Sequence, residues 1–234
     1  MTTHLSSNPS RVLVIALLVG VFGFVGQALA SDFRSEISRG DDARKEERYT
    51  DALSAYQKAG EAAKSDTDRA IALSKRALVQ AYDLRDYETA AELADAALSM
   101  PDVHPVGHVN AYQVKAVYHL KHNEDFRAAQ RTLDQAFKLD EVDWAHPTLH
   151  MLRGDARRLD GKGLEAIESY EVIAKDADLN DRFRATAWLN IGLSHQYVLR
   201  DATNAKTAYA EARKLHDGLG YEIDKHLERL ASSN

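Results

Sequence analysis

Histidines are the side chains in this sequence whose spacing suggests a metal site. They form pairs three or four residues apart, and these pairs are His104 and His108, His119 and His122, and His146 and His150. Two imidazoles at i, i+3 or i, i+4 on one helix can bind zinc or copper. Pro105 and Pro147 interrupt two of the pairs, and no cysteine or suitably spaced acid completes a ligand set. Histidine-dependent metal binding is therefore kept as an alternative function, and we assign no metal ligand and no cofactor.

The residues of covalent and acid–base catalysis do not form a recognisable set. The chain has no cysteine, no G-x-S-x-G sequence and no phosphate-binding loop of the Walker type. Gly161-Lys162-Gly163 is a glycine-rich basic segment, but its position suits a tight turn between helices. The carboxylates are scattered at spacings typical of exposed helix faces. We expect a protein that is not an enzyme, with no catalytic residues, and keep a hydrolase on a helical scaffold as a less favoured alternative.

The charge balance argues against nucleic acid as a partner. The 234 residues include 30 basic and 36 acidic side chains, for a net charge of −6. Binding to the phosphate backbone needs concentrated positive charge, which this composition does not supply.

The first thirty residues have the pattern of an export signal. Arg11 precedes an uninterrupted apolar run from Val12 to Gly26, and Ala28-Leu29-Ala30 precedes an abrupt polar change. A basic start, an apolar centre and an A-x-A end are typical of a cleaved signal peptide. We expect cleavage after Ala30, no membrane attachment afterwards, and localisation in a bacterial periplasm. The alternative is a retained N-terminal anchor that holds the rest of the chain outside the cytoplasm.

An alanine-rich pattern recurs five times at intervals of 37 to 39 residues. Each copy has an anchoring alanine, a second apolar or aromatic residue four positions later and a third apolar residue three positions after that. The three sets are Ala52, Ala90, Ala129, Ala166 and Ala205; Tyr56, Ala94, Leu133, Tyr170 and Tyr209; and Ala59, Ala97, Ala136, Ile173 and Ala212. Positions i, i+4 and i+7 share one face of a helix, and a repeat of this length predicts a helical solenoid.

A second helix is expected before each alanine-rich helix. Twelve or thirteen residues upstream of the anchoring alanines lie Gly40, Leu78, Val117, Gly154 and Gly192. Pro101 is expected to stop one helix and Pro147 to lie in the first turn of another. Ser65, Thr67 or Asp68 is expected to cap the second repeat, and Asn180 or Asp181 the fifth.

These residues resemble the tetratricopeptide repeat, whose pattern is W-x2-L-G-x2-Y followed by alanine, an aromatic residue and alanine. The matching positions in the last copy are Trp188, Ile191, Gly192, Ala205, Tyr209 and Ala212. The resemblance implies an all-α, α-α superhelix of about five helix pairs. The period is longer than the 34 residues of the family, and His195 replaces the tyrosine, so the superhelix geometry is not carried over.

The expected domain boundaries follow from the repeat. Residues 1–30 are the signal peptide, and residues 31–217 contain repeats at about 33–66, 71–104, 110–143, 147–180 and 185–219. Residues 220–234 form a capping helix and a short tail, because a terminal repeat otherwise exposes its stacking face. The apolar side of this helix is expected to consist of Tyr221, Ile223, Leu227 and Leu230.

In the tetratricopeptide family the first helix of each pair lines a concave groove that often holds a peptide. By position, the resemblance places these residues in the groove: Lys75, Tyr82, Tyr118, Lys121, His122, Asp155, Arg158, Gln196 and Tyr197. This mixture suits a peptide with apolar and acidic groups. The alternative is that Val79, Leu189 and Leu193 pack against neighbouring repeats and only polar side chains reach water. We expect a non-catalytic scaffold or adaptor that binds a protein or peptide, and leave its oligomeric state open.

Overall fold

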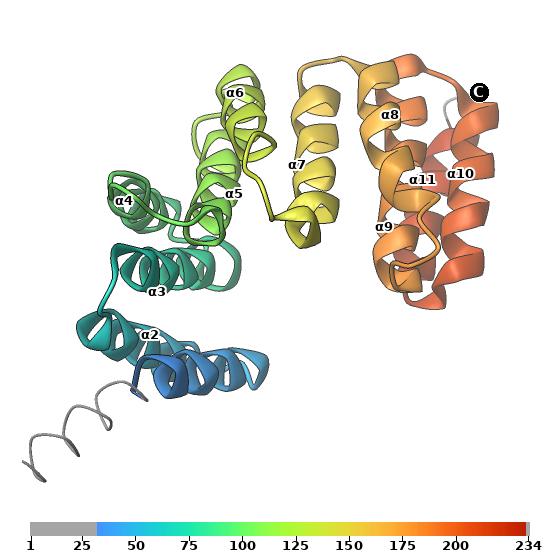
Figure 1. The fold of residues 1–234 in the computed structure, drawn as a ribbon. Coiled ribbons are helices and arrows are strands. Elements are labelled where there is room, and N and C mark those ends of the chain that lie inside the picture. The colour runs from blue at the N-terminus through green and yellow to red at the C-terminus, as the bar shows by residue number, and fades with distance from the viewer. Residues whose placement is uncertain (1–31, 233–234) are drawn as a thin grey trace, which may run out of the picture.

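The structure, a computed structural model, describes residues 32–232, so the expected signal segment lies outside the described residues. Within the described part, the chain forms helices joined by short connections, without strands. Successive helices pack against each other and follow an arch, with α4 and α6 on its outer side and α3 and α5 on its inner side (Figure 1). The fold is an all-α solenoid, as expected from the sequence.

The helices are joined by short turns within each pair and by connections between pairs that are longer in every case except the one between α2 and α3. In order they are the helix over residues 32–45, α2 (Tyr49–Ala62), α3 (Asp66–Leu78) continued by the π-helix η1 (Val79–Leu84), α4 (Tyr87–Leu98), α5 (Pro105–Lys121), α6 (Phe126–Ala136), the 3-10 helix η2 (Asp143–Ala145), α7 (His146–Leu159), α8 (Gly163–Ala174), α9 (Asp181–Leu193) continued by the π-helix η3 (Ser194–Leu199), α10 (Ala202–Leu215), the 3-10 helix η4 (Asp217–Leu219) and α11 (Gly220–Ser232). Helices α3, α5 and α9 begin before residues 71, 110 and 185, where the sequence pattern had placed the repeat starts.

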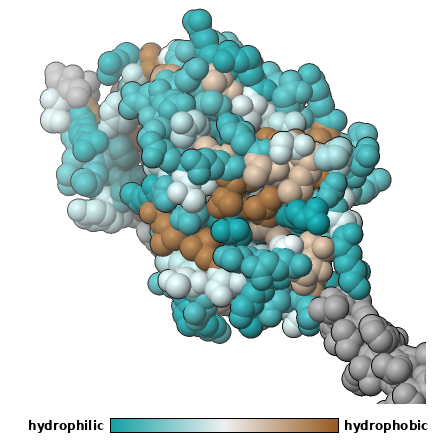
Figure 2. Space-filling model, turned by 90° about the vertical axis from the view of Figure 1, so that its left-hand side faces the viewer, coloured by the Kyte–Doolittle hydropathy of each residue, from teal (hydrophilic) through white to brown (hydrophobic). Residues whose placement is uncertain are grey.

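The residues of the alanine-rich pattern lie in the core. Every member of the three sets defined above is 1% exposed or less. Alanine loses no side-chain entropy on burial and lets neighbouring helices approach closely. On the face seen in Figure 2, hydrophobic side chains form a band between hydrophilic ones.

Three glycines in the first helices of their pairs lie directly against buried tyrosine rings. A Cβ atom added to Gly40 would lie 2.4 Å from Tyr56 Cε1, and one added to Gly154 would lie 2.3 Å from Tyr170 Cε1. Gly192 has the same relation to Tyr209, at 2.3 Å. In the two remaining pairs, larger residues replace the glycine and the tyrosine is absent. The tyrosine ring thus fills the space that the glycine leaves.

The turn inside each helix pair contains one residue with positive φ. These residues are Glu47, Arg85, Glu124, Gly161 and Arg200, with φ between 52° and 77°. Three of the turns are followed by an aspartate that caps the next helix, and Asp86, Asp125 and Asp201 accept from the backbone N–H groups of Thr89, Ala128 and Asn204. Gly161 confirms the tight turn expected from the sequence.

Helix caps between the pairs follow the sequence signals. Ser65 caps α3 by accepting from Asp68 N–H at 3.0 Å, and Asn180 caps α9 by accepting from Phe183 N–H at 2.9 Å. Pro147 lies in the first turn of α7, and α4 ends at Leu98, before Pro101. These caps explain why α3 and α9 start earlier than the periodic pattern alone indicated.

Helix α11 packs on α10 at the C-terminal end of the arch. Ile223 and Leu230 are buried and Leu227 is half-buried, so they cover the last repeat as expected. Tyr221 is 79% exposed, and its assignment to the covering face was wrong. No helix within residues 32–232 is long and apolar enough to cross a membrane.

Candidate functional site

The inner face of the arch is lined by the first helices of the pairs, and Tyr82 lies near its centre. Its hydroxyl accepts from Gln113 Nε2 of α5 at 2.9 Å. Burial raises the pKa of Tyr82 to about 12. The charge of Arg44 lowers this pKa and the charge of Asp155 raises it. The side chain is nevertheless 39% exposed. Tyr82 is thus an exposed ring whose hydroxyl is held by the next helix pair.

The sequence-predicted residues Lys75, Asp155 and Arg158 all take part in contacts on this face. Lys75 Nζ lies 2.7 Å from Asp41 Oδ1, which also accepts from Tyr56 OH at 2.7 Å. In the fourth pair, Asp155 likewise accepts from Tyr170 OH at 2.7 Å, but its cation comes from the same helix, with Arg158 3.5 Å from Asp155. Burial, followed by the charge of Asp155, raises the pKa of Tyr170.

A further ion pair joins the first two helices of the inner face. Arg44 Nε lies 2.6 Å from Asp83 Oδ2, and both side chains are half-buried. Together with Asp41 and Lys75 they border a pocket of about 400 Å³ at the N-terminal end of the arch. Two of the cations in this pocket, Arg44 and Lys75, pair with aspartates of the same pocket, whereas Lys45, which also lines it, lies 3.5 Å from Asp42 outside the lining.

The predicted residues of the third pair form a separate group at the end of α5. Tyr118 and His122 stack with their ring centres 5.1 Å apart, and His122 Nε2 lies 3.4 Å from Glu88 of α4. Lys121 is exposed beside them. This group is directed partly towards α4, and only Lys121 offers an exposed charge without a contact of its own.

Gln196 and Tyr197 of η3 contact the C-terminal helix. Gln196 is buried, because its carbonyl oxygen accepts from Tyr209 OH and its amide donates to the backbone oxygen of His226 at 3.2 Å. The expectation that Gln196 presents an open side chain to a groove was therefore wrong. Tyr197 is 38% exposed, and its hydroxyl lies 2.9 Å from His226 Nδ1.

The apolar residues of the predicted groove pack into the core. Val79 and Leu189 are buried, and Leu193 is half-buried against the last core cluster. The exposed lining of the inner face is thus polar and aromatic, with Tyr82 and Tyr197 as its exposed rings.

The histidine pairs do not assemble into a larger ligand set. Within residues 32–232 no group of three or more His, Cys, Asp and Glu side chains is placed to hold a metal ion. His104 lies 3.0 Å from Glu141, and His146 and His150 both contact the ring of Phe137. Burial, and then the charge of Arg153, lowers the pKa of His150 to about 4.

Several residues of the inner face were missed by sequence reasoning. Asp41 and Gln113 contact the predicted residues Lys75 and Tyr82, Arg44 and Asp83 pair with each other, and Arg229 of α11 donates to Tyr197 OH at 3.2 Å. Asp41 could have been found, because it follows Gly40 as Asp155 follows Gly154. The other four depend on how successive pairs are rotated relative to one another, which the repeat pattern does not encode.

Comparisons with known proteins agree with this architecture. No protein-family profile matches the chain, and no curated protein matches it. Among solved structures, the crystal structure of MamA protein, a tetratricopeptide-repeat protein, matches with a TM-score of 0.54 and 19% sequence identity. The match covers 82% of this chain and 96% of that chain. At this identity it shows the fold, a tetratricopeptide-like helical solenoid, while the number of repeats stays a prediction.

Proposed function

We propose that this protein is a non-catalytic scaffold that binds a peptide segment of another protein along the inner face of its arch. The observation that carries the proposal is Tyr82, an exposed ring of the inner face that bonds to Gln113 of the next helix pair and is influenced by the charges of Arg44 and Asp155 from two other pairs. Aromatic side chains in such positions supply much of the binding energy of protein interfaces. The match to MamA supports a repeat scaffold through the fold alone.

The polar side chains around Tyr82 support binding because their own contacts already order them. Arg44 is paired with Asp83, Lys75 with Asp41, and Arg158 with Asp155. A surface that is ordered before binding loses less side-chain entropy when a partner arrives. The inner face is therefore suited to a partner that adapts its own conformation, such as an extended peptide.

We further propose that binding takes place outside the cytoplasm. This part rests on residues 1–30, whose pattern is that of a signal peptide. A periplasmic protein without cysteine depends on helix packing for its stability, which the buried alanines provide.

Site-specific photo-crosslinking in cells tests the inner face. A photoreactive phenylalanine analogue replaces Tyr82 in one variant and Val172, which is 52% exposed on α8, in a matched control. We expect adducts with a defined protein from position 82 in the periplasmic fraction and far fewer from position 172. Equal adduct patterns from the two positions, or none from position 82, would contradict the proposal. Recovery of the adduct in the cytoplasmic fraction would contradict only the localisation.

A further inference from the structure

A pocket of about 340 Å³ lies at the first junction between helix pairs, where α2 meets α3. Its lining includes Gln57 and Glu61 of α2 and Arg69, Leu73 and Arg76 of α3. It shares no lining residue with the inner-face pocket described above. Sites for small organic groups typically have volumes of about 300–1,000 Å³, so the α2–α3 pocket can take a single side chain.

The next two junctions between pairs are each bridged by an acid and a cation. Lys115 Nζ of α5 lies 2.9 Å from Asp95 of α4, and Arg153 Nη2 of α7 lies 2.9 Å from Asp134 of α6. The side chains of the two cations are only 20% and 21% exposed. In each junction, an aspartate of one pair therefore satisfies a cation of the next pair that is largely withdrawn from water.

The first junction has the cation of this bridge without its acid. Arg76 occupies the same place in its helix as Lys115, two residues before the position that is glycine in three of the pairs. The position five residues after the anchoring alanine, which holds Asp95 and Asp134 in the next two pairs, holds the neutral Gln57 here. Arg76 and Gln57 both line the α2–α3 pocket.

Arg76 has no partner within the part of the chain that the structure describes. It is half-buried, its Nε–H is buried without a hydrogen-bond acceptor, and no described carboxylate pairs with its guanidinium group. Arg69 pairs with Asp66 at 2.6 Å, and Glu61 accepts from Gln57 at 3.1 Å. A buried donor without an acceptor is unfavourable, so a carboxylate that reaches Arg76 gains by satisfying it.

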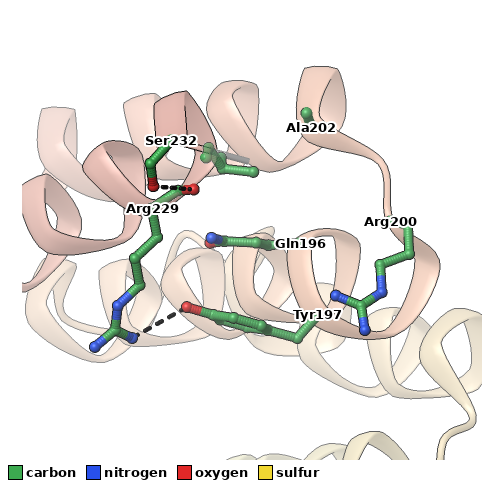
Figure 3. Close-up of a pocket in the computed structure, with 7 residues that line it drawn as sticks. Gln196, Tyr197, Arg200, Ala202, Arg229 and Ser232 are labelled. Carbon is green, nitrogen blue, oxygen red and sulfur yellow. Dashed lines mark hydrogen bonds between the residues drawn. The ribbon is translucent and has the colours of Figure 1, made fainter. Parts of the chain in front are cut away.

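Cations in two other pockets already have partners. Arg229 lines the pocket between η3 and α11 and donates to Tyr197 OH at 3.2 Å, a bond that Figure 3 shows. In the inner-face pocket, Arg44 and Lys75 form ion pairs with aspartates. A ligand of Arg76, in contrast, has no described contact of that side chain to share or to break.

We propose that the α2–α3 pocket is a second binding site, at which Arg76 binds the carboxylate of an aspartate or glutamate side chain of a partner protein. This carboxylate takes the place that Asp95 and Asp134 have in the next two junctions. Guanidinium groups bind carboxylates by paired, charge-assisted hydrogen bonds. Leu73 adds apolar surface to the lining, which favours apolar neighbours of the acid in the partner. The inference goes beyond the proposed function, because the site shares no lining residue with the inner-face pocket.

The test uses protein produced from the full sequence and three probes. The peptide Ac-Gly-Leu-Asp-Leu-Gly-NH2 has one side-chain carboxylate between two apolar residues, and the same peptide with asparagine is its neutral control. Sodium acetate is the free-carboxylate probe. In NMR titrations, the backbone amide shifts of α3 measure Kd, and the Nε–H resonance of Arg76 reports contact with its guanidinium group.

We expect the aspartate peptide to shift the Arg76 resonance to saturation and the asparagine peptide to leave it unchanged. Arg76→Gln should weaken binding of the aspartate peptide at least fivefold, since the charge-assisted bonds are lost. The matched control Arg182→Gln, at an exposed position of α9, should change Kd less than twofold. Because Arg76 has no described partner in the fold, Arg76→Gln should leave the melting temperature nearly unchanged, which separates lost binding from lost folding.

Substitutions at Gln57 test whether the ligand replaces a missing half of the bridge. Gln57→Asp supplies an acid at the position of Asp95, which should pair with Arg76 and weaken binding of the aspartate peptide at least fivefold. Gln57→Asn has the same size without the charge and also loses the bond to Glu61, so it is the matched control. It should change Kd less than threefold.

Any of four results would overturn the assignment. They are an aspartate peptide that leaves the Arg76 resonance unchanged, equal binding of the asparagine peptide, equal losses in Arg76→Gln and Arg182→Gln, and acetate binding as tight as that of the aspartate peptide. The last result would identify a small-acid site without a protein partner. Photo-crosslinking from position 82 does not involve this pocket, so the proposed function and the carboxylate site can fail independently.

Discussion

Gly154 and Tyr170 are in close contact. We therefore expect a double substitution, with a larger residue at 154 and a smaller one at 170, to destabilise the protein less than the two single substitutions would if their effects simply added. A Cβ atom at position 154 would lie within 2.3 to 2.6 Å of three atoms of the Tyr170 ring, which is fully buried. Gly154→Leu therefore forces α7 and α8 apart, and overpacking of this kind typically costs about 1–3 kcal/mol. Tyr170→Ala removes a buried ring, for which the usual loss is about 3–5 kcal/mol.

The second helix pair contains the exchanged arrangement, with Leu78 in the position of the glycine and Ala94 in the position of the tyrosine. Ala94 is fully buried there and Leu78 packs against the same core. Gly154→Leu combined with Tyr170→Ala reproduces this pair in the fourth repeat. The leucine then occupies part of the space left by the ring, so the two losses should not add. We expect the double variant to be more stable than the sum of the single losses by about 1–3 kcal/mol.

Urea denaturation followed by circular dichroism measures the free energies of unfolding of the four proteins in this cycle. Gly220→Ala is a matched control, because nothing lies within 4 Å of the added Cβ atom, and it should not destabilise the protein. Losses that simply add in the double variant would refute the claim that glycine and tyrosine share one space. A Gly154→Leu variant as stable as the wild type would refute the helix contact itself.

Two further predictions follow from the turns and the histidines. Glu124 has a φ of 52°, a backbone conformation that costs a non-glycine residue about 1–2 kcal/mol. Glu124→Gly should therefore raise the free energy of unfolding by about 0.5–1 kcal/mol. The control Glu168→Gly, inside α8, should lower the free energy of unfolding by about 1 kcal/mol. Because the pKa of His150 is lowered to about 4 in the folded protein, the unfolded chain binds its proton first, and stability should fall as the pH decreases from about 6.5 to 4. Denaturation curves between pH 7 and pH 4 measure how the free energy of unfolding changes with pH. His150→Gln should reduce this pH dependence more than His122→Gln, a substitution at an exposed position. An equal pH dependence in both variants would contradict the role of His150.

The core could be predicted from the sequence because a helix face depends on spacing within a short segment. All members of the alanine-rich pattern are buried, and the capping positions at Ser65 and Asn180 are occupied as expected. Tyr221 was assigned to the covering face because it is partly apolar, without regard to its angular position around the helix axis. Ile223, Leu227 and Leu230 follow the i, i+4, i+7 spacing, whereas Tyr221 lies two residues, or about 200°, from Ile223.

The candidate site was predictable only in part, because it is built between repeats. The register identified Lys75, Tyr82 and Asp155 as inner-face residues, and all three have contacts there. Their partners Asp41 and Gln113 come from other helix pairs. Which residues meet across pairs depends on the rotation between them, and that rotation follows from the sum of many contacts rather than from a local pattern.

The glycine–tyrosine contact joins the packing of the solenoid to the chemistry of its inner face. Tyr56 and Tyr170 fill the space beside a glycine, and each hydroxyl then holds the aspartate that follows that glycine, Asp41 or Asp155. In the second and third pairs, which lack this contact, the equivalent inner positions are the apolar Val79 and the aromatic Tyr118. The fixed charges of the inner face come from the first, second and fourth pairs, as the ion pairs Arg44–Asp83, Lys75–Asp41 and Arg158–Asp155. Under the proposed function, a peptide along this face would meet these ion pairs together with the exposed rings of Tyr82 and Tyr197, which favours a partner segment that carries both polar and apolar side chains.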